Sequence, residues 1–344
     1  MTLRRWFLAS LVICIFTAAG VGYWFFSELH RPYFGGTEGE VFVEIPRGAT
    51  SSSIARQLAN AGILRSRLPF IAYLRWNYLS RHLKAGEYRF VAAATPIEIA
   101  RRIAAGDVYY LTVVVPEGLT ARETVELIAK SGIGKLDGLL AGLGRTDWIR
   151  DLAPGARDLE GFLFPATYRA TRKMSSEEIL QTMVSEFRER FASLSSRFPV
   201  PAGWNAERIV TLASIVEKEV KAPEERPLVA SVMLNRLKAG MPLGCDATVV
   251  YALKIGAGFD GNLHKSDLAM ESPYNTYTHR GLPPGPIACP GEASIRAALK
   301  PAVSEYLYYV SRNDGTHQFS TDYRSHELAV AKYQKSPARL GRPK

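Results

Sequence analysis

A long apolar run near the N-terminus constrains this chain more than any other feature. From Trp6 to Phe26 the sequence holds 21 residues without a charged side chain, and two arginines precede the run. At ~1.5 Å per residue, a helix of this length crosses a hydrocarbon core of ~30 Å. Because positive charge favours the cytoplasmic side, we expect residues 1–5 to be a cytoplasmic tail and residues 6–26 a single-pass transmembrane helix in the inner membrane, with the rest of the chain extracytoplasmic.

A cleaved signal peptide is the alternative interpretation of this run. Small residues at 18–20 provide a potential cleavage region. The apolar stretch continues past them to a full membrane span, which favours an uncleaved anchor. Both interpretations export the remainder of the chain.

The charge balance indicates the class of partner. The chain has 43 Lys and Arg against 33 Asp and Glu, a net charge of +10. Such a balance suits an anionic polymer or surface. Export excludes nucleic acid as a partner and leaves a cell-wall polymer or anionic lipid headgroups.

The segment after the anchor has a linker and then a small mixed unit. Residues 27–40 contain three glycines among charged positions and predict a linker. A strand at 41–45, two amphipathic helical stretches and a strand at 86–91 make a β-α-α-β unit. This unit resembles a LysM-type module, a family that binds chitin-like and peptidoglycan glycans, so residues 41–110 are a predicted LysM-like domain. Glycan binding and a purely structural spacer both stay open for it.

The rest of the chain predicts a larger second domain at 111–335 and a solvated basic tail at 336–344. The strand, Pro-x-Gly turn and helix cap of residues 43–50 occur again at 113–120. Helices are expected at 175–193, 206–221 and 224–239. The Asn-Asp-Gly turn at 313–315 predicts a hairpin between strands at 306–310 and 318–319.

The helix around residues 207–220 carries the first candidate for catalysis. At ~100° per residue, Glu217 and Glu219 lie on opposite borders of its apolar stripe. A carboxyl group in an apolar cleft has a raised pKa and is suited to donate a proton. Periodicity leaves undecided which of the two is desolvated, and also whether both are surface carboxylates paired with nearby Lys or Arg side chains.

Downstream, phrases rich in Pro, Gly, Tyr and Asn follow at 243–249, 272–277 and 281–291. Pro and Gly define stiff turns here, and stiff loops with Tyr, Asn and Asp can line a groove. A tyrosine ring covers the apolar face of a sugar, and an amide matches its polar substituents. The competing interpretation is that each phrase is a turn-rich connection without a binding role.

Five phrases taken together resemble one family. They are Leu-Glu-Gly-Phe-Leu-Phe-Pro at 159–165, Ala-Ser-Ile-Val-Glu-Lys-Glu at 213–219, Val-Ala-Ser-Val-Met-Leu-Asn-Arg-Leu at 229–237, Tyr-Asn-Thr-Tyr at 274–277 and Gly-Leu-Pro-Pro-Gly-Pro-Ile at 281–287. In this order they are similar to the endolytic murein transglycosylase family, also called YceG-like. The resemblance extends from the anchor to about residue 335.

The resemblance implies a lytic transglycosylase that cuts the bond from N-acetylmuramic acid to N-acetylglucosamine within peptidoglycan strands. It assigns the catalytic role to the first Glu of the Ile-Val-Glu-Lys-Glu phrase, Glu217. That residue would donate a proton to the leaving oxygen and then accept the proton of the muramyl C6 hydroxyl, which closes a 1,6-anhydro ring. No cofactor and no metal ion are expected.

The resemblance also implies substrate-binding residues around a cleft. These are Glu160, Asp246, Thr248, Tyr274, Asn275, Thr276, Tyr277 and Pro284. One phrase departs from the family pattern: residues 243–249 read Leu-Gly-Cys-Asp-Ala-Thr-Val, where the family usually has Leu-Gln-Ser/Thr-Asp-Pro-Thr-Val. Because Cys245 and Cys289 both lie in phrases that would flank one cleft, we expect them to be close and to form a disulfide in an oxidising compartment. The alternative is that they are two unpaired small residues of the core.

By resemblance the fold is α+β: a transmembrane helix, the small LysM-like β-α-α-β domain, and a larger mixed α/β catalytic domain with a glycan-binding cleft. The expected partners are peptidoglycan glycan strands, the inner membrane and the peptidoglycan synthases (penicillin-binding proteins). No Gly-x-Ser-x-Gly or His-Glu-x-x-His phrase supports a serine or zinc hydrolase. The main alternative is a non-catalytic protein that binds peptidoglycan or scaffolds the cell-wall synthesis machinery.

Overall fold

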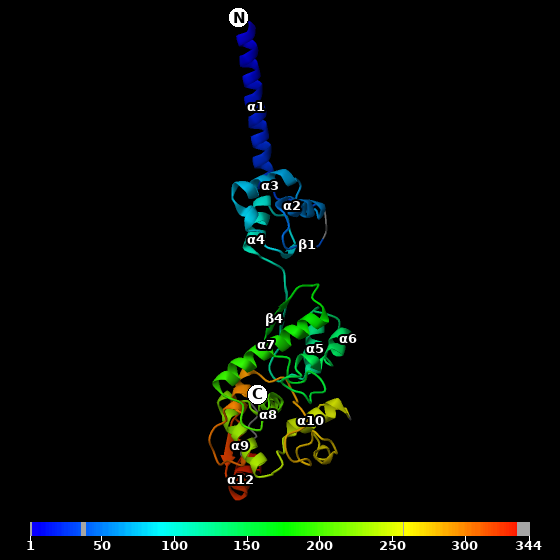
Figure 1. Ribbon diagram of the computed structural model, residues 1–344, viewed down its shortest axis with the longest axis vertical. Helices are drawn as coiled ribbons and strands as arrows, with labels where there is room; N and C mark the ends of the chain where they lie inside the picture. Colours follow the sequence, from blue (N-terminus) through cyan, green and yellow to red (C-terminus); the bar gives the residue numbers. More distant parts are fainter. Residues whose placement is uncertain (1, 36–38, 257, 336–344) are drawn as a thin grey trace. The chain divides into compact units, whose positions relative to one another are not determined.

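The computed structural model describes residues 2–35, 39–256 and 258–335. It divides into two compact units, residues 1–110 and 111–344, each with its own hydrophobic core. Both units combine helices with small two-stranded antiparallel sheets, so the chain is a mixed α/β protein (Figure 1). The predicted basic tail at 336–344 lies outside the described residues.

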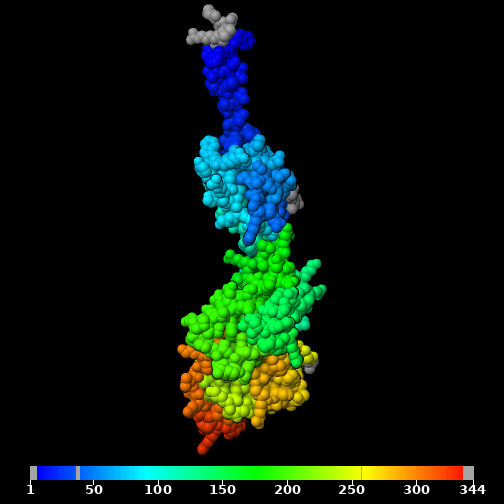
Figure 2. Space-filling model, viewed as in Figure 1, coloured from blue at the N-terminus to red at the C-terminus, as the bar shows by residue number. Residues whose placement is uncertain are grey.

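Unit 1 begins with a long apolar helix. Helix α1 (Thr2–His30) contains a stretch, Trp6–His30, that is long and apolar enough to cross a membrane, with a mean hydropathy of 1.9 and none of its most apolar window buried. Figure 2 shows this helix as an isolated rod that leaves the body of the unit. A helix whose most apolar window is fully exposed fits a single-pass membrane anchor.

The segment predicted as a linker is partly ordered against unit 1. Helix α1 continues four residues beyond Phe26, and Leu29 is buried. The amide of Tyr33 donates to Ala94 O (3.1 Å), and that of Gly35 donates to Gly62 O (2.8 Å). Helix α1 therefore joins the folded part of the unit within a few residues of its C-terminal end.

The body of unit 1 pairs two strands and packs three helices on them. Its elements are β1 (Val41–Ile45), α2 (Ser51–Asn60), α3 (Arg67–Trp76), a 3₁₀ turn at Leu79–Arg81, β2 (Gly86–Phe90) and α4 (Pro96–Ala105). β1 and β2 pair from Val41 opposite Phe90 to Ile45 opposite Gly86. Helix α4, which starts with Pro in a complete capping box, extends the predicted β-α-α-β order by one helix.

Unit 2 contains the remaining elements. They are β3 (Leu111–Val114), α5 (Ala121–Lys130), α6 (Leu136–Gly142), β4 (Thr167–Ala170), α7 (Ser176–Arg197), α8 (Ala206–Glu219), α9 (Arg226–Lys238), α10 (Asp246–Ile255), α11 (Glu292–Leu299), β5 (Tyr308–Ser311), β6 (His317–Ser320) and α12 (Tyr323–Val330), with short 3₁₀ turns and a final π-helical turn, Ala331–Lys335. The three predicted helices of this unit and its predicted hairpin are confirmed.

The sequence pattern that occurs at residues 43–50 and again at 113–120 corresponds to a repeated local structure. In both copies a strand leads through a turn into a helix whose N-cap threonine accepts a backbone N–H: Thr50 from Ser53 and Thr120 from Glu123. In both copies the strand also pairs with a later antiparallel strand, β1 with β2 and β3 with β4. The second copy positions the turn at 116–118, which forms part of the candidate site.

Helix α8 is the central element of the unit 2 core. Every residue from Ile209 to Val216 is buried, and α8 packs mainly on α11. Ser214 Oγ accepts the amide of Ile287 (3.0 Å), which ties the Pro- and Gly-rich loop to the helix. The buried stretch ends at Val216, so the two candidate carboxylates lie where α8 leaves the core.

Candidate active site

Glu217 is held by groups that donate hydrogen bonds. Its Oε1 accepts from Arg226 Nη2 (3.1 Å) and its Oε2 accepts from the Gly291 amide (3.0 Å), while its side chain is 6% exposed. These donors satisfy a carboxylate rather than a neutral acid. The apolar surroundings expected for a proton donor are therefore not those of Glu217 in this structure.

Arg226 joins Glu217 to a second carboxylate that sequence reasoning missed. Its Nη2 lies 3.9 Å from Glu117 Oε2, and its Nε donates to Ser294 Oγ (3.0 Å). Burial and the neighbouring charge of Glu217 raise the pKa of Glu117, and Arg226 opposes this shift. The available signal was the repeated Pro-x-Gly turn, whose second copy has Glu117 in its middle.

Glu219 has different surroundings. Burial of its carboxyl group raises its pKa, and the charge of Asp246 acts in the same direction. The hydroxyl of Tyr309 donates to its Oε2 (3.0 Å) and opposes the shift. A partly desolvated carboxyl is what periodicity predicted for one member of the pair, and Glu219 matches that description.

Glu219 lines a cavity of ≈ 420 Å³ between the end of α8 and the β5–β6 hairpin. The other lining residues are Lys221, Ser311, Asn313, Gly315 and His317. His317 is fixed by Glu225, whose Oε1 accepts the His317 amide (2.9 Å) and whose Oε2 lies 2.6 Å from Nδ1. This cavity has the polar lining and the perturbed carboxyl group that favour a site of proton transfer.

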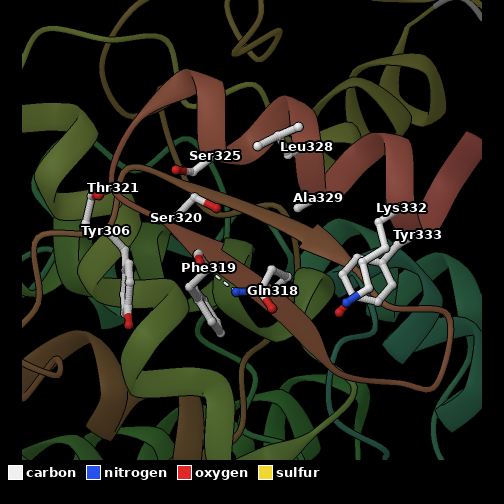
Figure 3. Close-up of a pocket in the computed structure, with 10 residues that line it drawn as sticks. All are labelled: Tyr306, Gln318, Phe319, Ser320, Thr321, Ser325, Leu328, Ala329, Lys332 and Tyr333. Carbon is white, nitrogen blue, oxygen red and sulfur yellow. Dashed lines mark hydrogen bonds between the residues drawn. The ribbon is translucent and has the colours of Figure 1, made fainter.

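A second pocket lies on another part of the same hairpin. Figure 3 shows the residues that line it, from β6, α12 and their neighbours. The volume of this pocket is ≈ 420 Å³. Tyr306, Phe319 and Tyr333 supply aromatic surface, and Ser320 and Ser325 supply hydroxyl groups. Its lining residues, within the part of the chain that the structure describes, include no Asp or Glu, so it is a weaker candidate for catalysis than the cavity at Glu219.

Two predicted contact residues lie on the Glu219 side. The hydroxyl of Tyr277 donates to Asp246 Oδ1 (2.6 Å), and both side chains are exposed. Asp246 is the first residue of α10 and its charge reaches Glu219. The pair is available to a ligand.

Three predicted contact residues are used inside the protein. Thr248, Asn275 and Thr276 are each at most 1% exposed. Asn275 Nδ2 donates to the carbonyl oxygens of two residues in the preceding turn, and Thr276 Oγ1 accepts the Cys245 amide (2.9 Å). In this conformation they shape the loop and have no surface with which to contact a ligand.

Glu160, Tyr274 and Pro284 lie elsewhere in unit 2. Burial raises the pKa of Glu160 to about 8, although its Oε1 accepts the Ala121 amide (2.9 Å). Glu160 borders a pocket of ≈ 320 Å³ together with Tyr251, whose ring lies 4.9 Å from that of the half-buried Tyr274. Pro284 is exposed.

Cys245 and Cys289 are free, buried thiols in the structure, and the expected disulfide is not formed. Each thiol has its own hydrogen-bond acceptor: Leu243 O lies 3.7 Å from Cys245 Sγ, and Glu160 Oε1 lies 3.9 Å from Cys289 Sγ. The two phrases thus place their cysteines in separate buried surroundings. Within residues 2–35, 39–256 and 258–335, no group of three His, Cys, Asp or Glu residues is arranged to hold a metal ion.

Comparison with known proteins identifies the relatives of this chain. Residues 43–332 match the YceG-like family. A Bacillus subtilis (strain 168) protein named endolytic murein transglycosylase is 32% identical over 312 residues, which are 85% of this chain and 84% of that protein.

A Streptococcus pneumoniae (strain D39) protein of the same name is 26% identical over 97% of this chain and 66% of its own length. Among solved structures, a yceG-like protein from Listeria monocytogenes aligns with a TM-score of 0.56 and 28% identity, covering 85% of this chain and 99% of that one.

Proposed function

The chain belongs to the YceG-like family, and on that premise we propose that it is a membrane-anchored endolytic murein transglycosylase. The family match spans most of the chain, and the Bacillus subtilis relative of this name is covered over most of its length. The reaction is cleavage of the β-1,4 bond from N-acetylmuramic acid to N-acetylglucosamine within a peptidoglycan strand, which leaves a 1,6-anhydro end.

The proton-transfer group is one of the two carboxyl groups at the end of α8. The family resemblance nominates Glu217, whose carboxylate is paired with Arg226 and the Gly291 amide. The physical observations favour Glu219, because its pKa is raised by burial and it lines a cavity. The family match over residues 43–332 carries the proposal, and the cavity beside Glu219, together with the upward shift that burial gives the pKa of its carboxyl group, is the reason to test Glu219 first.

The chemistry follows from one such group. The neutral carboxyl donates its proton to the glycosidic oxygen as the bond to C1 breaks. The resulting carboxylate then takes the proton of the muramyl C6 hydroxyl, whose oxygen bonds to C1. The acid is regenerated and no water is consumed, so a second catalytic carboxyl at hydrolase spacing is not needed.

The cavity around Glu219 is the proposed centre of a glycan-binding cleft. Tyr277 and Asp246 lie on this side and supply an aromatic ring and a carboxylate for sugar hydroxyl groups. Glu160, Tyr274 and Pro284 stay proposed contacts in a longer cleft. Thr248, Asn275 and Thr276 would contact substrate only if the loop moved.

The remaining parts fit the same proposal. Residues 41–110 would be a LysM-like domain and residues 111–335 the catalytic domain, on the outer side of the inner membrane with the N-terminus in the cytoplasm. Peptidoglycan strands are the substrate, and the peptidoglycan synthases that make them are the proposed protein partners.

The test compares conservative variants on peptidoglycan sacculi, with anhydro-muropeptides detected by mass spectrometry. Loss of the acid lowers the rate by about 10²–10⁴-fold, and we expect this for Glu219→Gln. Glu207→Gln, in the first turn of α8, is the matched control and should keep wild-type turnover. Full activity of Glu219→Gln with loss in Glu217→Gln would return the role to Glu217. A wild-type protein that binds sacculi without releasing anhydro products would support the non-catalytic alternative.

A further inference from the structure

One stretch of unit 1 has a one-sided charge. Residues 45–86 contain no Asp and no Glu, but they contain seven basic residues: Arg47, Arg56, Arg65, Arg67, Arg75, Arg81 and Lys84. All seven are exposed. A surface of this kind favours an anionic partner.

Large apolar side chains lie exposed among these cations. Leu68 and Trp76 are 70% and 82% exposed, and with Arg75 they occupy the i, i+7 and i+8 positions on the outer stripe of α3. Phe70 and Leu74, on the inner side of the same helix, are fully buried.

Tyr78 follows the end of α3 and is 83% exposed, with a backbone φ of 56° that is unusual for a residue with a side chain. A second large and exposed aromatic ring therefore follows Trp76 by two residues. Neither ring contributes to the described core of unit 1.

The start of α3 lies beside the membrane anchor. Glu28 and Arg31, at the end of α1, line one small surface depression together with Leu64, Arg65 and Ser66, which directly precede α3. Helix α1 contacts both α3 and α4, and Figure 1 shows α3 at the end of the unit from which α1 leaves. With the chain hydrogen-bonded at Tyr33 and Gly35, this end of the unit is held close to the bilayer surface.

We propose that this basic–aromatic face docks on anionic phospholipid headgroups of the bilayer that α1 spans. The face consists of Leu68, Arg75, Trp76, Tyr78 and Arg81. Lys84 does not belong to it, because its Nζ donates to Ala105 O at the end of α4 (3.0 Å). Trp and Tyr are enriched at membrane–water interfaces, and exposed Lys and Arg near a membrane bind anionic lipid. An apolar stripe flanked by cations is typical of a protein surface that lies in the headgroup layer. The inference rests on α1 crossing a bilayer and does not depend on the catalytic assignment.

The test uses the full chain in liposomes, with an environment-sensitive fluorophore at an exposed site of the face. Ser80→Cys, in a Cys14→Ala background, places the fluorophore between Tyr78 and Arg81, and the two remaining cysteines are buried. Nitroxide lipids labelled in the headgroup quench a docked probe. We expect strong quenching in vesicles of phosphatidylcholine with phosphatidylglycerol, weak quenching in phosphatidylcholine alone, and weaker quenching at high salt.

Charge reversal provides the matched comparison. Arg75→Glu and Arg81→Glu together should lower the equilibrium constant for docking by about twentyfold or more, since each lost cation removes about a fivefold preference for anionic lipid. Reversal of Lys265 and Arg280, two exposed cations of unit 2, changes the net charge equally and should leave the quenching as in the wild type.

Other outcomes would overturn the proposal. Quenching at residue 80 that is the same with and without phosphatidylglycerol, or that survives the reversal in unit 1, contradicts docking on anionic lipid. A fluorophore on the native Cys14, quenched by nitroxides deep in the acyl chains, checks separately that α1 is inserted. Protection of residue 80 by isolated glycan strands, without lipid dependence, would make the face a carbohydrate site instead.

Discussion

Replacing Glu160 with glutamine should remove a pH dependence from the stability of unit 2. Glu160 is 7% exposed, and its carboxyl oxygens accept the Ala121 amide (2.9 Å) and the Tyr251 hydroxyl (3.3 Å). Burial raises its pKa from 4.5 to about 8, with the Ala121 hydrogen bond opposing. The folded protein therefore holds a proton at Glu160 that the unfolded chain releases.

The sign and size of the effect follow from this proton. Between about pH 4.5 and pH 8 the unfolded state binds fewer protons at this site, so the free energy of unfolding falls as the pH rises. The stabilising contribution is complete below the unfolded pKa and is lost as the pH approaches the folded pKa. At ~1.4 kcal/mol per pH unit, the loss between about pH 5 and pH 8 is on the order of 4 kcal/mol.

Urea unfolding of the full chain in detergent micelles, followed by near-ultraviolet circular dichroism, measures this slope. In Glu160→Gln the amide is neutral at every pH and its oxygen still accepts from Ala121. We therefore expect the free energy of unfolding of the variant to increase relative to that of the wild type as the pH rises. Glu178→Gln is the control, because its capping-box hydrogen bonds from Ser175 lower the pKa of Glu178 and place its titration below this window. A wild type and Glu160→Gln with equal pH slopes would show that Glu160 is ionised in the folded protein and would refute the reasoning.

Three further predictions follow from single contacts. Tyr309→Phe removes the hydrogen bond that lowers the pKa of Glu219, so the alkaline limb of the kcat/KM profile on glycan strands should move to higher pH; an unmoved limb would separate Glu219 from catalysis. Gly161 has a φ of +85°, and in Gly161→Ala the added Cβ would lie 2.6 Å from the ring of Pro286. The substitution should lower the free energy of unfolding, measured by urea denaturation, by about 3 kcal/mol. A loss below about 1 kcal/mol would contradict this. Cys245 and Cys289 should resist maleimide in the native protein, because burial raises the pKa of both thiols. Both should react with maleimide after unfolding without reductant. Two cysteines that stay unreactive in the unfolded protein would be joined in a disulfide.

Sequence predicted the parts of the fold that local pattern determines. The apolar run indicated helix α1, and 3.6-residue periodicity with capping residues placed α7, α8 and α9. The Asn-Asp-Gly turn indicated the β5–β6 hairpin. The boundaries differ by a few residues because helix ends depend on tertiary contacts, as at the end of α1, where Leu29 packs against unit 1.

The candidate site was less predictable because its contacts join distant segments. Arg226 brings together Glu117 and Glu217, which are 100 residues apart, and no local pattern encodes that meeting. Periodicity left two carboxyl groups on α8 as candidates, and their surroundings come from β5 and from the loop before α11, which no local pattern indicates. The polar loop phrases were recognised as unusual, yet Asn275 uses its amide to hold its own loop.

The link between the start and the end of unit 2 has a consequence for the order in which the chain folds during synthesis. The amide of Gly118 donates to Cys289 O (2.9 Å), and the amide of Cys289 donates to Leu119 O (2.7 Å). A ribosome makes these partners some 170 residues apart, so the first turn of unit 2 waits, unpaired, for several seconds at least. Unit 1 has all its sheet partners within residues 41–90 and can fold while this happens. The nascent protein therefore passes through a stage in which unit 1 is folded and unit 2 is still open, and during that stage the unpaired segments of unit 2 are exposed to proteases and to aggregation.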